Sequence, residues 1–327
     1  MSRKTDQGMV TYSFSRSQER SECRQDKTGE LRPEPYLLFD AGGTLVFPDQ
    51  PFLVQQAQEQ GMELTDTQLF HGYYRLIHTL DCQARSQSGR FPTPWARGYV
   101  YALFETLGIV GPATDVIAQA FEDRHRQKNL WTFTFHWVRK MLSDLTAQGY
   151  RMSVMSNSDG RTAEVFQDLG LDHYFEHIFD SQILGAEKPD PAIFEAALRK
   201  LNVSPANALY IGDIFFVDIL GANRAGLGGI HLDPLGLYTG WPGTRLRDVR
   251  DLPGWLGSHY VHSWKLDLFP LKGLRYPIPT SYETITPVLK TPSPGGPLWS
   301  KENLPEIGEG WPDFTSGAQQ QSQPVLA

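Results

Sequence analysis

Polar side chains that could carry out chemistry together follow short apolar runs at several points in this sequence. They are Asp40 and Thr44 after "YLLF", Ser156 and Asn157 after "RMSVM", Lys188 in "AEKPD", and Asp213 and Asp218 in "IGDIFFVD". Aspartates suit a hard cation such as Mg²⁺, and a carboxylate can also be a nucleophile in phosphoryl transfer. A hydroxyl group and a lysine beside it would hold phosphate oxygens and stabilise the charge of the transferring group.

Each of these residues also has a purely structural interpretation when it is taken alone. Asp40 could cap the end of a strand, Lys188 could be a solvated surface lysine, and Ser156 could be an ordinary loop residue. The chemical interpretation depends on whether the fold brings the four groups together.

The elements that would position these groups are strands separated by helices. Strands are predicted at residues 36–39, 151–156, 177–180, 208–213 and 228–233, and helices at 138–149, 161–169, 191–201 and 217–225. The apolar run at residues 36–39 is typical of a strand that is covered on both faces. Because strands that alternate with helices form parallel βαβ units, we expect an α/β fold with a doubly wound parallel sheet. The carboxyl ends of its strands would then meet at one edge, where such sheets bind ligands.

One region interrupts this alternation. Four helical patterns and no convincing strand occur between Pro51 and Trp131. The pattern predicts an all-helical cap over residues 51–131, inserted into a core formed by residues 35–50 and 132–257. Residues 1–34 are polar, which is typical of a disordered tail, and residues 258–327 are rich in proline, which indicates an extended or disordered segment.

Composition narrows the class of function. A net charge of −7 argues against nucleic acid as a partner, since binding it needs a basic face. The two cysteines, Cys23 and Cys82, predict no disulfide framework. We find no apolar run long enough for a membrane span, and the polar first residues do not resemble a secretory signal. We therefore expect a soluble, cytoplasmic protein without a membrane partner, and the sequence leaves its oligomeric state open.

The four groups, in this order and spacing, resemble the motifs of the haloacid dehalogenase-like (HAD) hydrolase superfamily. The motifs are "LLFDAGGTL", "VMSNSDG", "GAEKPDPAIF" and "IGDIFFVDILGANRAG", with a cap between the first two. The resemblance implies that Asp40 is a nucleophile and that Ser156, with Thr44 and Asn157, binds phosphate. It implies that Lys188 stabilises the anionic centre and that Asp213 and Asp218 join Asp40 in binding Mg²⁺.

Gly42 departs from the family pattern. Phosphatases of this family usually carry a second aspartate there as a general acid and base. The resemblance implies that the backbone carbonyl of residue 42 also binds Mg²⁺, and glycine keeps that carbonyl. Losing a positioned general acid costs about 10²–10⁴-fold in rate. His71, Tyr73, His78 and Asp81 in the predicted cap are possible replacements.

Three functions remain open at this point. The first is a Mg²⁺-dependent phosphatase that acts on a small phosphorylated substrate through an aspartyl-phosphate intermediate, whose acid comes from elsewhere or whose substrates have good leaving groups. The second is a 2-haloacid dehalogenase, which needs no general acid, but Asp213 and Asp218 argue for a metal and against it. Arg75, Arg85, Arg90 and Arg97 could bind either a carboxylate or a phosphate. The third is a catalytically degenerate member that binds a ligand or partner.

Overall fold

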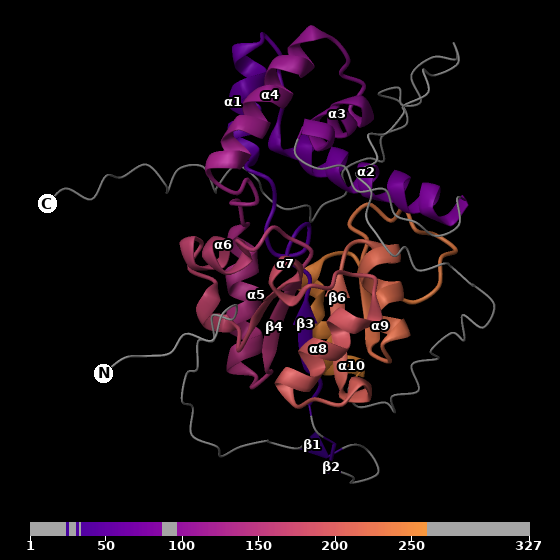
Figure 1. Ribbon diagram of the computed structural model, residues 1–327. Helices are drawn as coiled ribbons and strands as arrows, with labels where there is room; N and C mark the ends of the chain where they lie inside the picture. The colour runs from indigo at the N-terminus through magenta and orange to yellow at the C-terminus, as the bar shows by residue number, and fades with distance from the viewer. Residues whose placement is uncertain (1–23, 26–30, 33, 87–96, 260–327) are drawn as a thin grey trace, which may run out of the picture.

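The computed structural model describes residues 24–25, 31–32, 34–86 and 97–259 (Figure 1). The predictions for residues 1–34 and 258–327 fall almost entirely outside this range. Within the first segment, β1 (Arg24–Gln25) and β2 (Leu31–Arg32) pair as a short antiparallel ribbon. For the rest of these two segments, the predicted disorder stays a prediction.

A six-stranded parallel sheet forms the core, with the strand order β5-β4-β3-β6-β7-β8. The strands are β3 (Tyr36–Phe39), β4 (Met152–Ser156), β5 (Ile178–Asp180), β6 (Ala208–Gly212), β7 (Gly228–Leu232) and β8 (Thr244–Leu246). The predicted doubly wound α/β sheet is therefore confirmed, with strand ends shifted by one residue at most. β8 was missed, because three residues of mixed burial leave no run to detect. The chain builds outward from β3 in one direction and then the other, so the strand order reverses at β3, where such sheets bind ligands.

Both faces of the sheet are covered, which explains the unbroken apolar run of β3. Leu37 and Phe39 point into the cluster that contains α5 (His136–Ala147), α6 (Thr162–Asp168) and α10 (Leu252–His259). Tyr36 and Leu38 point into the opposite cluster, with α8 (Pro191–Leu201) and α9 (Leu220–Arg224). Successive side chains of a strand alternate between faces, so a strand covered on both sides has no polar position.

The core helices lie where their sequences predict, although their bounds differ: the helix predicted at 138–149 is α5 (His136–Ala147). In α5, the residues at the predicted spacing, Val138, Met141, Leu142 and Leu145, are all buried. In α8, Asp190 is the N-cap, and its side chain accepts a hydrogen bond from the Ala192 N–H. Pro191 follows it in the first turn. The helix predicted at 217–225 divides into a π-helical turn, η3 (Phe215–Ile219), and α9. A four-residue helix, α7 (Ser181–Leu184), follows β5.

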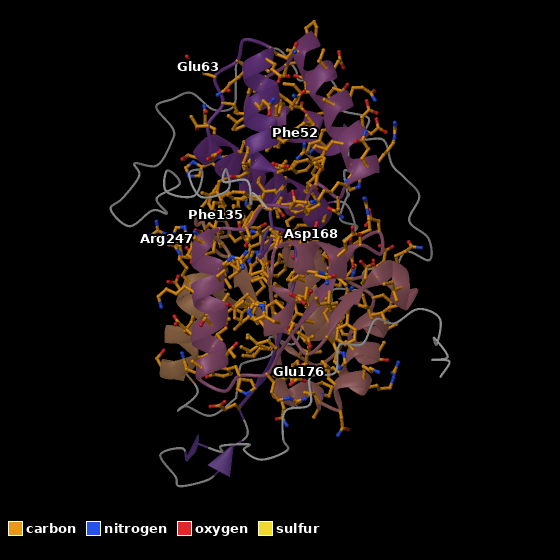
Figure 2. All side chains as sticks on the ribbon, turned by 90° about the vertical axis from the view of Figure 1, so that its left-hand side faces the viewer. Phe52, Glu63, Phe135, Asp168, Glu176 and Arg247 are labelled. Atoms are coloured by element: carbon orange, nitrogen blue, oxygen red, sulfur yellow. The ribbon has the colours of Figure 1, made fainter. Side chains whose placement is uncertain are left out.

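Four helices lie beyond the carboxyl edge of the sheet, in the region predicted to be the cap: α1 (Gln50–Glu59), α2 (Asp66–Ser86), α3 (Arg97–Thr106) and α4 (Pro112–Gln127) (Figure 1). Each corresponds to one of the four predicted patterns. The name cap is kept below for this region, and its being a separate domain stays a prediction. Phe52 lies in the cap and Glu176 at the far end of the core (Figure 2). None of the helices in the described part of the chain is long and apolar enough to cross a bilayer.

Asp81 fastens the cap helix α2 to the core. Its fully buried carboxylate accepts hydrogen bonds from the Phe215 N–H at 2.9 Å, the Phe216 N–H at 3.1 Å and the Tyr238 hydroxyl at 2.6 Å. Asp81 does not line the site described below, so its geometry favours a structural role over the role of a catalytic acid.

Replacing Asp81 with alanine is expected to lower the free energy of unfolding by about 3 kcal/mol or more, since each buried unpaired donor costs about 1–3 kcal/mol. Urea denaturation would measure the change. Asp123→Ala, at a half-exposed position of α4, is the matched control, and we expect a change within about 0.5 kcal/mol there. Equal changes in the free energy of unfolding for the two substitutions would show that Asp81 does not hold α2 against the core.

Candidate active site

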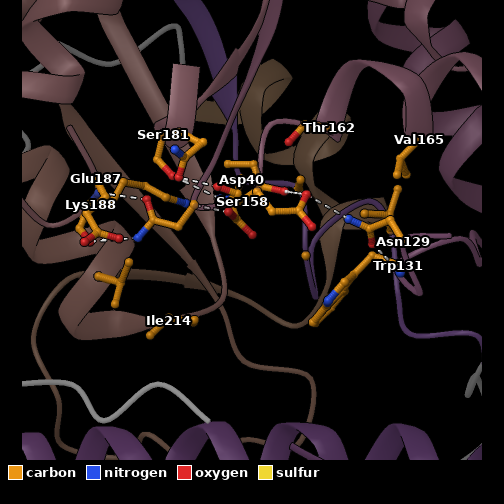
Figure 3. A pocket seen from close by; sticks show the side chains of 18 of the residues that line it. Asp40, Asn129, Trp131, Ser158, Thr162, Val165, Ser181, Glu187, Lys188 and Ile214 are labelled. Carbon is orange, nitrogen blue, oxygen red and sulfur yellow. Dashed lines mark hydrogen bonds and ion pairs between the residues drawn. The ribbon is translucent and has the colours of Figure 1, made fainter. Parts of the chain in front are cut away.

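The predicted functional groups converge at the carboxyl edge of the sheet. Asp40 follows β3, Ser156 ends β4 and Asp213 follows β6. A cavity of about 580 Å³ lies between this edge and the cap, and Asp40, Ser156 and Lys188 line it (Figure 3). Gly42 and Asn157 line it as well.

Lys188 joins two of the carboxylates. Its Nζ lies 2.5 Å from Asp40 Oδ1, 2.7 Å from Asp218 Oδ1 and 2.8 Å from the Tyr210 hydroxyl. All of these side chains are buried. Burial alone would lower the pKa of Lys188, but Asp218 and Asp40 raise it well above its usual value, so the ammonium stays charged. No sequence pattern marked Tyr210 as part of the site, because it lies in an apolar strand; its hydroxyl donates a hydrogen bond to the Met155 carbonyl at 3.0 Å.

Asp40, Asp213 and Asp218 form a group that could hold a metal ion. One carboxylate oxygen from each lies within 4.8 Å of the others. Asp213 Oδ1 is buried and accepts no hydrogen bond within the described part of the chain. Burial, together with the neighbouring carboxylates, raises the pKa of Asp213 well above its usual value and that of Asp40 to about 7. Buried charges are normally paired or bound to metal, and three carboxylates share one ammonium here, so an oxygen-binding dication such as Mg²⁺ fits this donor set.

Tyr73 brings the cap into contact with this group. It lies on α2, and its hydroxyl donates a hydrogen bond to Asp213 Oδ2 at 2.9 Å. Burial raises the pKa of Tyr73 well above its usual value, so the hydroxyl keeps its proton and orients the carboxylate. A contact between residues 73 and 213 has no local signature in a sequence.

Removing this hydroxyl should weaken cation binding. Partners that orient a metal ligand are typically worth about 10–100-fold in affinity, and we expect a loss in that range for Tyr73→Phe. Calorimetric titration with Mg²⁺ would measure it. Tyr101→Phe, which removes a hydroxyl bonded to Asp115 within the cap, is the control. Unchanged affinity in Tyr73→Phe would show that the tyrosine does not support the metal site.

Two glycines in the loop after β3 meet crowded surroundings. Gly43 has φ +76°, and a Cβ there would lie 2.2 Å from Asp213 Oδ2 and 2.3 Å from the Tyr73 hydroxyl, so glycine is needed. A Cβ on Gly42 would lie 3.0 Å from the Trp131 ring. An aspartate at position 42 would therefore press on this indole, which makes a simple reintroduction of the missing carboxylate unfavourable. The structure does not show the Gly42 carbonyl bound to any group, and its metal role stays a prediction.

Of two other predicted phosphate ligands, Asn157 lines the cavity and Thr44 does not. Asn157 donates from Nδ2 to the Lys188 carbonyl and accepts from the Lys188 N–H, both at 2.8 Å. Asn157 therefore positions Lys188, and a direct contact with phosphate stays a prediction. Thr44 is buried and does not line the cavity.

Most of the candidate acids and cations of the cap lie away from the cavity. Of the four candidate acids, only Tyr73 lines it; His71, His78 and Asp81 do not. Arg75 and Arg85 do not line it either, and Arg90 and the side chain of Arg97 fall outside the described residues. The cap instead contributes Trp131, Tyr99 and His125 among other residues, none of which was predicted.

Comparisons with known proteins agree on one family. The family model described as haloacid dehalogenase-like hydrolase matches residues 36–226. The mouse (Mus musculus) haloacid dehalogenase-like hydrolase domain-containing protein 3 is 29% identical over 160 residues, 44% of this chain and 61% of that protein. The glyceraldehyde 3-phosphate phosphatase of Methanothermobacter thermautotrophicus is 40% identical over 92 residues, 27% of this chain and 40% of that protein. The chain thus spans less than two thirds of the length of either relative.

Among solved structures, the HAD-hydrolase YfnB from Bacillus subtilis, bound to magnesium, is 20% identical with a TM-score of 0.48. The match covers 69% of this chain and 99% of that one.

Proposed function

Because the chain belongs to the haloacid dehalogenase-like hydrolases, we propose that this hydrolase is a Mg²⁺-dependent phosphatase that acts on a small phosphorylated substrate. The observation that carries the proposal is the buried group of Asp40, Asp213 and Asp218 around Lys188, of which Asp40 and Lys188 line the cavity. Relatives named glyceraldehyde 3-phosphate phosphatase support the phosphatase activity. A cytoplasmic location is part of the proposal.

Each side chain has a role in this mechanism. Asp40, which lines the cavity, attacks phosphorus and becomes an aspartyl phosphate. Lys188, which is hydrogen-bonded to Asp40 Oδ1, offers its charge to the phosphate, while Ser156 on the neighbouring strand binds a phosphate oxygen. Asp213 and Asp218, with Asp40 and the Gly42 carbonyl, would hold Mg²⁺. When bound, the ion neutralises charge on the phosphate.

The dehalogenase remains the alternative reaction at the same nucleophile. A haloacid brings a carboxylate that needs a cation other than Lys188, and the described residues that line the cavity include no arginine. Asp213 Oδ1, which is buried without a hydrogen bond among the described residues, also suits a metal ion that the dehalogenase reaction does not need. Both observations favour phosphate as the group that is attacked.

The proposal is tested by measuring product release from the purified full-length chain. Phosphate release from acetyl phosphate and p-nitrophenyl phosphate is expected with Mg²⁺ and should stop on chelation. Chloride release from 2-chloropropionate that is indifferent to the chelator would replace the phosphatase with the dehalogenase. No product from any of the three would favour a degenerate member that only binds a ligand or partner.

A further inference from the structure

The two walls of the cavity above Asp40 differ in polarity. The core contributes polar side chains, Ser158 and Ser181 among them, beside apolar ones such as Val165 and Ile214 (Figure 3). The cap side contributes a mostly apolar wall that includes Leu76, Ile77, Leu80, Tyr99, Phe121 and Trp131, with Tyr73, His125 and Asn129 as its polar members. At about 580 Å³ the cavity is large enough for an organic group well beyond a phosphate. The part of the substrate that faces the cap is therefore expected to be apolar.

Aromatic rings form a continuous surface on this wall. The Trp131 ring centroid lies 6.0 Å from that of Tyr73 and 6.1 Å from that of Tyr99, and Tyr99 lies 5.7 Å from Phe121. Aromatic rings attract further rings in edge-to-face or offset-stacked geometry. Such a surface favours an aromatic group over an aliphatic one of equal size.

The charges in the cavity are unfavourable for a second anionic group on the substrate. Among the described lining residues, the only cationic groups are Lys188, which already pairs with Asp40 and Asp218, and His125. Burial lowers the pKa of His125, so this side chain is largely neutral at pH 7. Asp159 and Glu187 add negative charge to the cavity. A substrate whose organic group carries no charge avoids repulsion there.

The first loop determines which leaving groups can depart. Position 42 has no carboxyl group to give a proton, and the Trp131 ring lies 3.0 Å from the place of a Cβ there. Tyr73 donates its hydrogen bond to Asp213, so it is not set to protonate a leaving oxygen. A phenolate leaves readily without a proton, whereas an alkoxide does not.

We propose that the substrate is an aryl phosphate monoester whose aromatic group carries no charge besides the phosphate and binds against Trp131, Tyr99 and Phe121; the proposal rests on the phosphatase function above. Asp40 attacks phosphorus, the bond between phosphorus and the aryl oxygen breaks, and its electron pair leaves on the phenolate. Water then attacks the aspartyl phosphate at phosphorus. This second step restores the Asp40 carboxylate and releases hydrogen phosphate and one proton, which the phenolate takes up.

The test compares kcat/KM, with Mg²⁺, for 1-naphthyl phosphate, phosphoglycolate and glyceraldehyde 3-phosphate. Acetyl phosphate, a small substrate with a good leaving group and no ring, reports on the phosphatase function alone. We expect 1-naphthyl phosphate to exceed the two alkyl esters at least about 100-fold, because those need the protonation step that is worth about 10²–10⁴-fold. Benzyl phosphate, which has a ring but leaves as an alkoxide, should fall between them.

A pair of variants tests the apolar wall itself. Ile77→Lys places a cation in the cavity and should lower the preference for 1-naphthyl phosphate over phosphoglycolate at least about tenfold. Val116→Lys adds the same charge at an exposed position of α4 that does not line the cavity, and the preference should not change. Should Ile77→Lys fail to fold, inhibition of wild-type acetyl phosphate hydrolysis gives the same answer: 1-naphthylphosphonate should inhibit at least about tenfold more strongly than phosphonoacetate.

The outcomes separate the two proposals. Hydrolysis of acetyl phosphate with no preference for the naphthyl ester would overturn the aryl substrate and leave the phosphatase standing. Equal inhibition by the two phosphonates would do the same. No phosphate from any substrate would overturn both.

Discussion

Asp40→Asn should abolish turnover while the protein stays folded. The carboxylate lines the cavity directly after β3 and has a charged partner, Lys188, at 2.5 Å. An amide is nearly isosteric and can still accept that hydrogen bond, but it is not a nucleophile. We expect a loss of about 10⁴-fold or more in kcat, as for other enzymes that lose a nucleophile.

Phosphate release with acetyl phosphate and Mg²⁺, measured beside a thermal melt, would check this expectation. Asp168→Asn is the matched control, since Asp168 is exposed at the end of α6 and pairs with Lys128. It should retain wild-type activity. Near-normal turnover in Asp40→Asn would remove Asp40 from the role of nucleophile, and an unfolded Asp40→Asn would call for Asp40→Glu as a second variant.

Lys188→Met is expected to have the largest effect on stability. The substitution preserves most of the side-chain volume but leaves Asp40 and Asp218 buried without their common cation. Breaking a buried ion pair by removing one partner costs about 3–5 kcal/mol. Urea denaturation at pH 8 without divalent ions should show a decrease of this size. Lys200→Met, on the exposed side of α8, should change stability by less than about 0.5 kcal/mol.

The pH dependence of the Lys188→Met defect follows from the same geometry. Burial already raises the pKa of Asp40 to about 7, and Lys188 opposes the increase. Without Lys188 the folded-state pKa of Asp40 rises further above its unfolded value. A carboxyl group of this kind favours the folded state while it is protonated, and that benefit disappears as pH rises from the unfolded pKa through the folded one.

We therefore expect the difference in unfolding free energy between wild type and Lys188→Met to be larger at pH 8 than at pH 5. A difference independent of pH would show that lost packing, and not an uncompensated carboxylate, causes the defect. Added Mg²⁺ should also restore part of the stability at pH 8, because a cation bound to the same carboxylates would replace the missing charge.

Local patterns in the sequence determined the core and the floor of the site. These patterns are the apolar runs of the strands, the 3.6-residue spacing in α5 and the N-cap of α8 at Asp190. Each depends on neighbours within a few residues. Parallel strands place their carboxyl ends along one edge, so strand assignment alone was enough to bring together Asp40, Ser156, Lys188 and Asp213. The absence of a carboxylate at Gly42 can also be read directly from the chain.

Only the tertiary structure decided what surrounds that floor. The bonds from Tyr73 to Asp213 and from Asp81 to Phe215, and the Trp131 ring beside Gly42, join segments far apart in the sequence. They depend on how the cap helices pack over the sheet edge. A helical pattern fixes which residues share a face, but it does not fix the rotation and tilt of that helix on a distant partner. For this reason the sequence predicted an attacking aspartate, while the aromatic wall that it faces emerged only from the fold.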